Sequence, residues 1–127
     1  MTNLSFSFPV RAMSKDNEKY TGRNGRPFTS KKFKDFEFLL RTYMRSQLPD
    51  KFVPFQKEGI VVKLFVWFKN RVRLDAGNIP KSILDAGNGE RGSGGLIWKD
   101  DRLITDLQVK IFYGPEEKIE MEVIAPT

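Results

Sequence analysis

The segment Ile60–Phe68 reads Ile-Val-Val-Lys-Leu-Phe-Val-Trp-Phe and is almost continuously apolar. Its one charged residue is Lys63, and most of the others are β-branched or aromatic. A short apolar run of this composition is typical of a buried strand at the centre of a sheet. We therefore expect a central strand here, covered on both of its faces.

Three further segments show the alternation of apolar and polar residues that a half-buried strand requires. They cover residues 3–9, 103–111 and 119–123. The last two are separated by the turn sequence Gly-Pro-Glu-Glu at 114–117, which predicts an antiparallel hairpin between them. Residues 10–28 are polar, basic and glycine-bearing, so we expect a long loop there, with a small ribbon as the alternative.

Two helices are expected between these strands. The first is expected to be capped by Thr29 or Ser30 and to run to about Gln47, because its apolar residues fall on one stripe. The second is short, covers residues 79–86, and is expected to have Asn78 as its N-cap. Its apolar residues lie on one face and its polar residues on the other.

The predicted order is therefore strand, helix, strand, helix, strand, strand. We expect a single α+β domain over residues 1–127, with a mixed, mostly antiparallel sheet of about four strands and two helices. No apolar run approaches the roughly 20 residues of a membrane span, and the start of the chain has no signal-peptide layout. We therefore expect no membrane association, and a cytoplasmic location is the default expectation.

The composition restricts the chemistry that this chain can perform. It has no histidine and no cysteine, which excludes histidine acid–base catalysis, thiol nucleophiles, disulfides and zinc sites built on these residues. The net charge of +6 is uneven, with ten basic and four acidic residues over 11–45 but nine acidic and five basic residues over 85–127. The basic region over residues 11–45, called the basic front below, favours a polyanion such as a nucleic acid as partner. A basic protein that binds no polyanion fits the same charge equally well.

The side chains that suit phosphodiester chemistry are gathered between residues 71 and 101. They are two arginines, an amide, a lysine and four carboxylates: Arg71, Arg73, Asp75, Asn78, Lys81, Asp85, Asp100 and Asp101. Asn78, Lys81 and Asp85 have the spacing that places them on one face of the short helix. Because the available ligands are oxygens, the metal expected at such a cluster is Mg²⁺ or Mn²⁺.

These residues also have ordinary structural explanations. Asp75 can begin a turn, Asn78 can cap the helix, and the pair Asp100 and Asp101 can be a solvated loop before a strand. Trp98 is more typical of a packing anchor than of a platform for base stacking. The glycine-rich stretch before it formally spells a dinucleotide-binding pattern, which we set aside because a helix precedes it and none follows.

The cluster resembles the RusA-type Holliday junction endonucleases, and the resemblance extends over nearly the whole chain. The family motif is Asp-x-Asp-Asn-x-x-Lys, an Asp four residues after the lysine, and later an Asp-Asp pair after an aromatic turn. The matching residues are Asp75, Asn78, Lys81, Asp85, Asp100 and Asp101, with Arg71 and Arg73 as the basic lead-in. The chain departs from the motif at Gly77, which replaces the second aspartate, and in a longer gap filled by residues 89–95.

The resemblance implies a metal-dependent endonuclease that resolves four-way DNA junctions by paired symmetric nicks, in recombination and repair. It implies that Asp75, Lys81 and Asp101 are catalytic and that Asp75, Asp100 and Asp101 hold Mg²⁺ or Mn²⁺. The DNA-binding residues would be Arg71, Arg73, Asn78, Arg23, Arg26 and Lys31, with Asp85 as an accessory residue. Two symmetric cuts imply a homodimer, because each chain has one acidic cluster.

Two other functions fit the same residues. The first is a branched-DNA-binding protein of the same fold with weak or no cleavage, because Gly77 removes a metal ligand. The second is an RNA-binding or protein-interaction domain that uses the basic loop and keeps the carboxylates in structural ion pairs.

Overall fold

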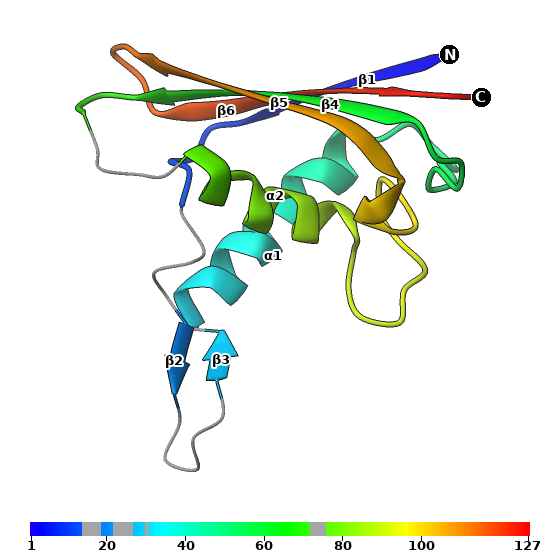
Figure 1. Ribbon diagram of the computed structural model, residues 1–127, viewed down its shortest axis with the longest axis horizontal. Helices are drawn as coiled ribbons and strands as arrows, with labels where there is room; N and C mark the ends of the chain where they lie inside the picture. Colours follow the sequence, from blue (N-terminus) through cyan, green and yellow to red (C-terminus); the bar gives the residue numbers. More distant parts are fainter. Residues whose placement is uncertain (14–18, 22–26, 30, 72–75) are drawn as a thin grey trace.

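Both helices lie on one face of a four-stranded sheet, as Figure 1 shows for the computed structural model. The strand order in the sheet is β1-β6-β4-β5, and the expected α+β class with a mixed sheet is confirmed. The structure describes residues 1–13, 19–21, 27–29, 31–71 and 76–127. The elements, with η for 3₁₀ turns, are β1 Thr2–Phe8, β2 Lys19–Thr21, β3 Pro27–Thr29, α1 Lys31–Gln47, β4 Ile60–Phe68, η2 Ala76–Asn78, α2 Pro80–Gly87, η3 Asp101–Leu103, β5 Ile104–Tyr113 and β6 Lys118–Ala125.

The predicted hairpin between the last two strands is wrong. β5 pairs in parallel with β4, and β6 pairs antiparallel with the other edge of β4, so β4 separates them. The chain crosses the end of β4 between them, where the backbone N–H of Gly114 donates to the carbonyl of Phe68 at 3.0 Å. The alternation of apolar and polar residues located both strands, but it carries no information on which strands pair with each other in the sheet. The apolar strand β4 is one of the two inner strands of the sheet, as its composition predicts.

The expectation that β4 is covered on both faces is also wrong. Its inward residues, Ile60, Val62, Leu64, Val66 and Phe68, are fully buried against the helices, whereas the residues between them are only half-buried. The outward aromatic residues cover one another instead. The rings of Trp67 and Phe112 stack at 5.0 Å between centroids, and the ammonium of Lys118 lies 4.8 Å from the Trp67 centroid. The outer face therefore explains the aromatic content of β4 without a second layer.

The extent and apolar stripe of helix α1 agree with the prediction. Of the two caps expected, Thr29 ends β3, and Ser30 lies outside the described residues. The buried residues of the helix are Phe33, Phe36, Leu40 and Met44, which form the expected stripe at helical spacing. Near its end, Gln47 donates to the carbonyl of Ser7 and accepts from its N–H, both at 2.8 Å. This side chain therefore satisfies backbone groups on the edge strand β1, which has no neighbouring strand on that side.

Helix α2 begins differently from the prediction. Asn78 is the last residue of η2 and not the N-cap, which is Ile79. Ile79 has helical backbone angles, φ −65° and ψ −44°, and its own apolar side chain makes no capping hydrogen bond. The turn η2 leads directly into α2, and Ile79 between them is fully buried. The apolar face of the helix, with Ile83 and Ala86, is buried as expected.

The loop at residues 10–28 contains the small ribbon that was the alternative expectation. β2 and β3 pair antiparallel, with Tyr20 opposite Phe28, and extend away from the sheet beyond the start of α1 (Figure 1). In the part of the chain that the structure describes, no helix is long and apolar enough to cross a membrane.

Candidate active site

Four of the residues proposed from the sequence lie outside the described residues: Asp75, Arg73, Arg23 and Arg26. The described members are divided between the two ends of α2. At the amino end are η2 and the first turn of the helix, with Gly77, Asn78 and Lys81. At the carboxyl end lies η3, with Asp100 and Asp101.

At the carboxyl end, Asp101 takes part in a hydrogen-bonded chain of three side chains. The indole Nε1–H of Trp98 donates to Oδ1 of Asn88 at 2.8 Å. The Nδ2 group of Asn88 then donates to Oδ2 of Asp101 at 3.1 Å. Trp98 is fully buried, while Asn88 and Asp101 are half-buried. The Asp101 carboxylate is therefore held against the end of α2 and not free in a loop.

Trp98 is the packing anchor that the sequence favoured, and two glycines allow its position. A Cβ on Gly87 would lie 2.7 Å from Cε2 of the indole, and a Cβ on Gly95 would lie 2.9 Å from the Cα of Lys99. Gly95 also has φ +111°, which L side chains rarely adopt. The glycine-rich stretch thus serves the packing of Trp98 and returns the chain to η3. It does not lead into the long helix that a dinucleotide-binding loop requires.

The neighbouring Asp100 is engaged differently. Its Oδ1 accepts from the backbone N–H of Arg102 at 2.9 Å, so it caps η3, and its Oδ2 accepts from Nε and Nη2 of Arg102 at 3.1 and 2.9 Å. These bonds from Arg102 lower the pKa of the Asp100 carboxyl. Both oxygens of Asp100 therefore have hydrogen-bond partners within η3 and its cap.

The polar face of α2 is present as expected. Lys81 is exposed and Asp85 is half-buried, four residues apart along the helix. Asn78 is half-buried in η2, where Gly77 is exposed. This face presents an ammonium group and an amide to solvent on the side of the helix opposite Ile83.

The described residues of the motif lie toward opposite ends of α2. The helix has eight residues, so its ends are separated by about 12 Å at 1.5 Å per residue. Gly77, the position of the family's second aspartate, precedes the helix, whereas Asn88 and Asp101 lie at its far end. Among the described residues no group of three or more acidic side chains could hold a metal ion. The described part of one chain therefore does not bring the motif together.

The donor set at Asp101 nevertheless fits a hard cation in part. The contact from Asn88 uses Oδ2, and within the described residues no hydrogen bond or ion pair involves Oδ1. A half-buried carboxylate with one fixed and one available oxygen is a suitable ligand for Mg²⁺ or Mn²⁺. A complete site requires further oxygens, and Asp75 is the remaining candidate from the motif.

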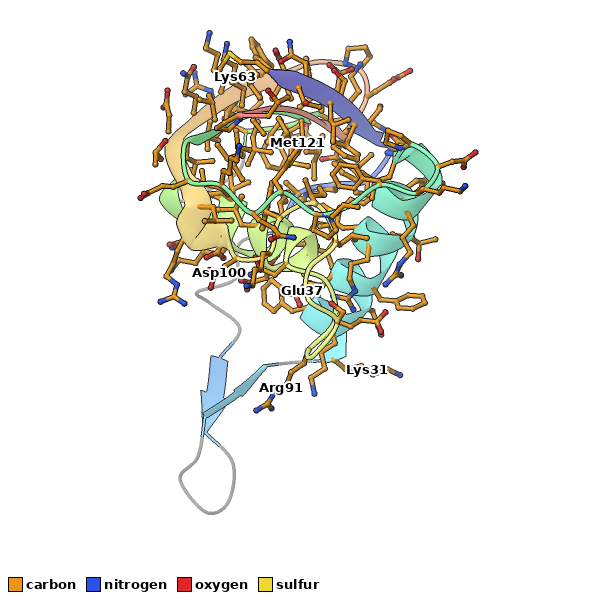
Figure 2. All side chains as sticks on the ribbon, turned by 90° about the vertical axis from the view of Figure 1, so that its right-hand side faces the viewer. Lys31, Glu37, Lys63, Arg91, Asp100 and Met121 are labelled. Carbon is orange, nitrogen blue, oxygen red and sulfur yellow. The ribbon has the colours of Figure 1, made fainter. Side chains whose placement is uncertain are left out.

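The basic residues proposed to bind DNA are exposed where they are described. Lys31 begins α1, and Arg71 follows β4. In Figure 2, Lys31 and Arg91 extend from the end of the molecule that carries the β2–β3 ribbon, whereas Lys63 projects from the opposite, outer face of the sheet. The helix-side surface thus carries cations near the ribbon, in keeping with the basic front of the sequence.

Asn88 is the residue of this site that sequence reasoning missed. The tetrapeptide Asp-Ala-Gly-Asn occurs at 75–78 and again at 85–88, and the second copy suggested only a turn. Its asparagine follows α2, and its N–H donates to the carbonyl of Leu84 at 3.1 Å. The sequence carries no signal for its contact with Asp101, because 12 residues separate the two and only the fold brings them together.

Comparison with known proteins identifies the family. Residues 9–124, almost the whole of the chain, match the family described as Endodeoxyribonuclease RusA. No match is found among curated proteins. The family match agrees with the motif found in the sequence and with the α+β fold that carries it. The chain therefore belongs to the RusA endodeoxyribonuclease family.

Proposed function

We propose that this protein is a divalent-metal-dependent endonuclease that resolves four-way DNA junctions by paired nicks, in recombination and repair. Family membership supports a nuclease acting on such junctions. The structural observation that carries the proposal is the carboxylate of Asp101, held through Oδ2 by Asn88 with Oδ1 available among the described residues.

The proposed roles follow from the chemistry of each side chain. When bound, a divalent cation would act as a Lewis acid that stabilises the negative charge developing on the phosphate. Asp75 and Asp101 would hold it with carboxylate oxygens, as the family motif implies. Lys81, exposed on α2, would place an ammonium group beside the scissile phosphate. Arg71 and Arg73 would bind the flanking phosphates.

Further residues would complete the contacts with DNA. Arg23, Arg26 and Lys31 would bind phosphates of the junction arms, and Asn78 would donate to the backbone near the cut. Asp85 would be an accessory residue on the same helix face as Lys81. Asp100 would join the metal site only if Arg102 released it, so we assign it a minor role.

A homodimer would bring together the motif residues that lie toward opposite ends of α2. If a two-fold axis placed the amino end of α2 from one copy beside η3 of the other, each site would combine the two halves of the motif. The same symmetry would give two equivalent sites, one for each strand that must be cut. The separation of Gly77 from Asp101 along α2 supports this arrangement over a site within one chain.

The first test is cleavage of a synthetic four-way junction by the purified protein with Mg²⁺ or Mn²⁺. We expect paired nicks at symmetric positions and none without the metal. A folded protein that leaves the junction intact in both metals would refute the proposal. Linear duplex and single-stranded RNA are the competitors, because a preference for RNA would favour an RNA-binding domain instead.

A second test distinguishes sites shared between copies from sites within one copy. Asp75→Asn and Asp101→Asn are each expected to be inactive, and the two are then mixed under conditions of subunit exchange. If each site is shared between the two copies, a mixed dimer has one intact site. Mixed dimers are about half of all dimers, so about a quarter of the wild-type number of sites is active and produces single nicks. With sites inside one chain, every site keeps one substitution and no cleavage returns.

The alternative is a junction-binding protein with weak or no cleavage, and one observation favours it. Gly77 is exposed in η2 and has no side chain where the family motif has a carboxylate. This alternative predicts junction binding at wild-type strength with little nicking in any metal. Efficient cleavage by the wild-type protein would eliminate it.

A further inference from the structure

The hydrogen bonds from Trp98 to Asn88 and from Asn88 to Asp101 run in one donor-to-acceptor direction, which the chemistry of the groups determines. An indole N–H can only donate, so the atom of Asn88 that faces it must be the amide oxygen. The amide nitrogen then has to point the other way, toward Oδ2 of Asp101. The buried indole therefore determines which face of the Asn88 amide the carboxylate meets.

The backbone holds Asn88 rigidly in this position. Its N–H donates to the carbonyls of Leu84 and Asp85 at 3.1 and 3.2 Å, so it remains attached to the end of α2. Trp98 is equally fixed, because the residues on both sides of it, Ile97 and Lys99, exchange hydrogen bonds with Phe55 at 2.9 Å. Two fixed groups thus set the orientation of the Asp101 carboxylate.

We propose that Asn88 is a positioning residue, which orients Asp101 so that Oδ1 faces the cation. The inference rests on the proposed function and adds a residue that the family motif does not contain. Asn88 does not touch the metal or the DNA in this proposal. It acts by keeping the Asp101 side chain in one rotamer. Hydrogen bonds to metal-ligating side chains commonly orient them in this way.

A purely structural role for Asn88 makes a different prediction. If Asn88 only satisfied the buried indole, any acceptor at that place would serve, and metal affinity would not depend on Trp98. If Asn88 positions Asp101, removing the indole donor frees the amide to rotate and weakens the metal site from a distance. Trp98→Phe therefore separates the two roles, because neither reading places Trp98 in contact with a cation.

The experiment measures Mn²⁺ affinity by titration calorimetry for wild type, Asn88→Ala, Trp98→Phe and the control Asn3→Ala. Asn3 is an exposed asparagine on β1, outside the site. We expect Asn88→Ala to weaken Mn²⁺ binding about 10-fold or more, and Trp98→Phe to weaken it by a smaller factor. Asn3→Ala should bind as wild type does.

A second experiment, NMR spectroscopy of the metal-free protein, tests the hydrogen bonds themselves. In the ¹H–¹⁵N spectrum the protein has two indole signals, from Trp98 and Trp67, and Trp67 serves as the internal reference. We expect Asp101→Ala to shift the Trp98 signal through Asn88, and Asp100→Ala to leave it in place. This comparison also shows that the folded protein contains the chain of bonds.

The outcomes are distinct. Wild-type protein that binds Mn²⁺ and cuts junctions, with unchanged affinity in Asn88→Ala and Trp98→Phe, would overturn the positioning role and leave the nuclease intact. Wild-type protein that neither binds Mn²⁺ nor cuts would overturn the proposed function and, with it, this inference. A Trp98 signal that does not respond to Asp101→Ala would also count against the positioning role.

Discussion

Gly87 and Trp98 are in such close contact that the ring occupies the space where a side chain would begin. A Cβ on Gly87 would lie 2.7 Å from Cε2 of the indole, which is fully buried and connected to the proposed site through Asn88. The backbone of Gly87 also accepts from the N–H of Ile97 at 2.9 Å, which fixes the distance. Packing of the short helix and the geometry of the site thus depend on one glycine.

We expect Gly87→Ala to destabilise the fold by about 1–3 kcal/mol, because the added methyl group overpacks the core. Urea unfolding followed by circular dichroism measures this change. Trp98 emission should shift as well, since the ring must move. The control is Gly92→Ala, because a Cβ added at Gly92 would meet no described atom within 4 Å beyond its chain neighbours, although φ is +81°. It should cost about 1 kcal/mol through the backbone alone and leave the emission unchanged.

Gly77→Asp should strengthen metal binding and cleavage. It restores a carboxylate at the exposed position in η2 where the family motif has one. We expect the rate of junction nicking at limiting Mg²⁺ to rise about 10-fold, measured by single-turnover cleavage. Gly77→Asn provides the matched control, because it adds the same volume without charge and should give a smaller increase. A rate that falls in the aspartate variant would show that this position does not face the metal.

The pair of Asp100 and Arg102 predicts a pH dependence of stability. Hydrogen bonds from Arg102 lower the pKa of Asp100 below its ordinary value of 3.8. A carboxyl with a lowered pKa in the folded state stabilises the fold above the pKa of the unfolded chain, and this contribution disappears as the pH falls through the folded value. Arg102→Ala should therefore lower the unfolding midpoint at neutral pH, with a difference that shrinks below about pH 4. The pKa of Asp100, followed by carboxyl NMR, should return toward 3.8 in this variant.

Junction binding should depend on salt through the exposed cations. Each phosphate contact releases counterions, so the logarithm of the binding constant falls linearly with the logarithm of salt concentration. Arg71→Ala or Lys31→Ala should each reduce the slope by about 1 without changing junction preference. Lys63→Ala is the control, because Lys63 projects from the outer face of the sheet (Figure 2). An equal loss of slope in Lys63→Ala would place the DNA on the outer face.

Several features of the fold could be predicted because they depend on local patterns. The stripe of α1 and the alternation in β1 and β6 report which residues face the core, and burial agrees with them. The β4 run was identified as the central strand for the same reason. The family motif likewise depends only on residue type and spacing, so it was visible before the fold was known.

The sequence alone determined the class of fold, the positions of the four sheet strands and of the two α-helices, the family and the exclusion of histidine and cysteine chemistry, since all of these follow from residue type and periodicity. Only the tertiary structure decided that β4 separates β5 from β6, that Asn78 does not cap α2, and that Asn88 contacts Asp101. These depend on which distant segments compete for the same hydrogen bonds and the same buried space. Periodicity describes one segment at a time, whereas the outcome of that competition is a property of the folded chain.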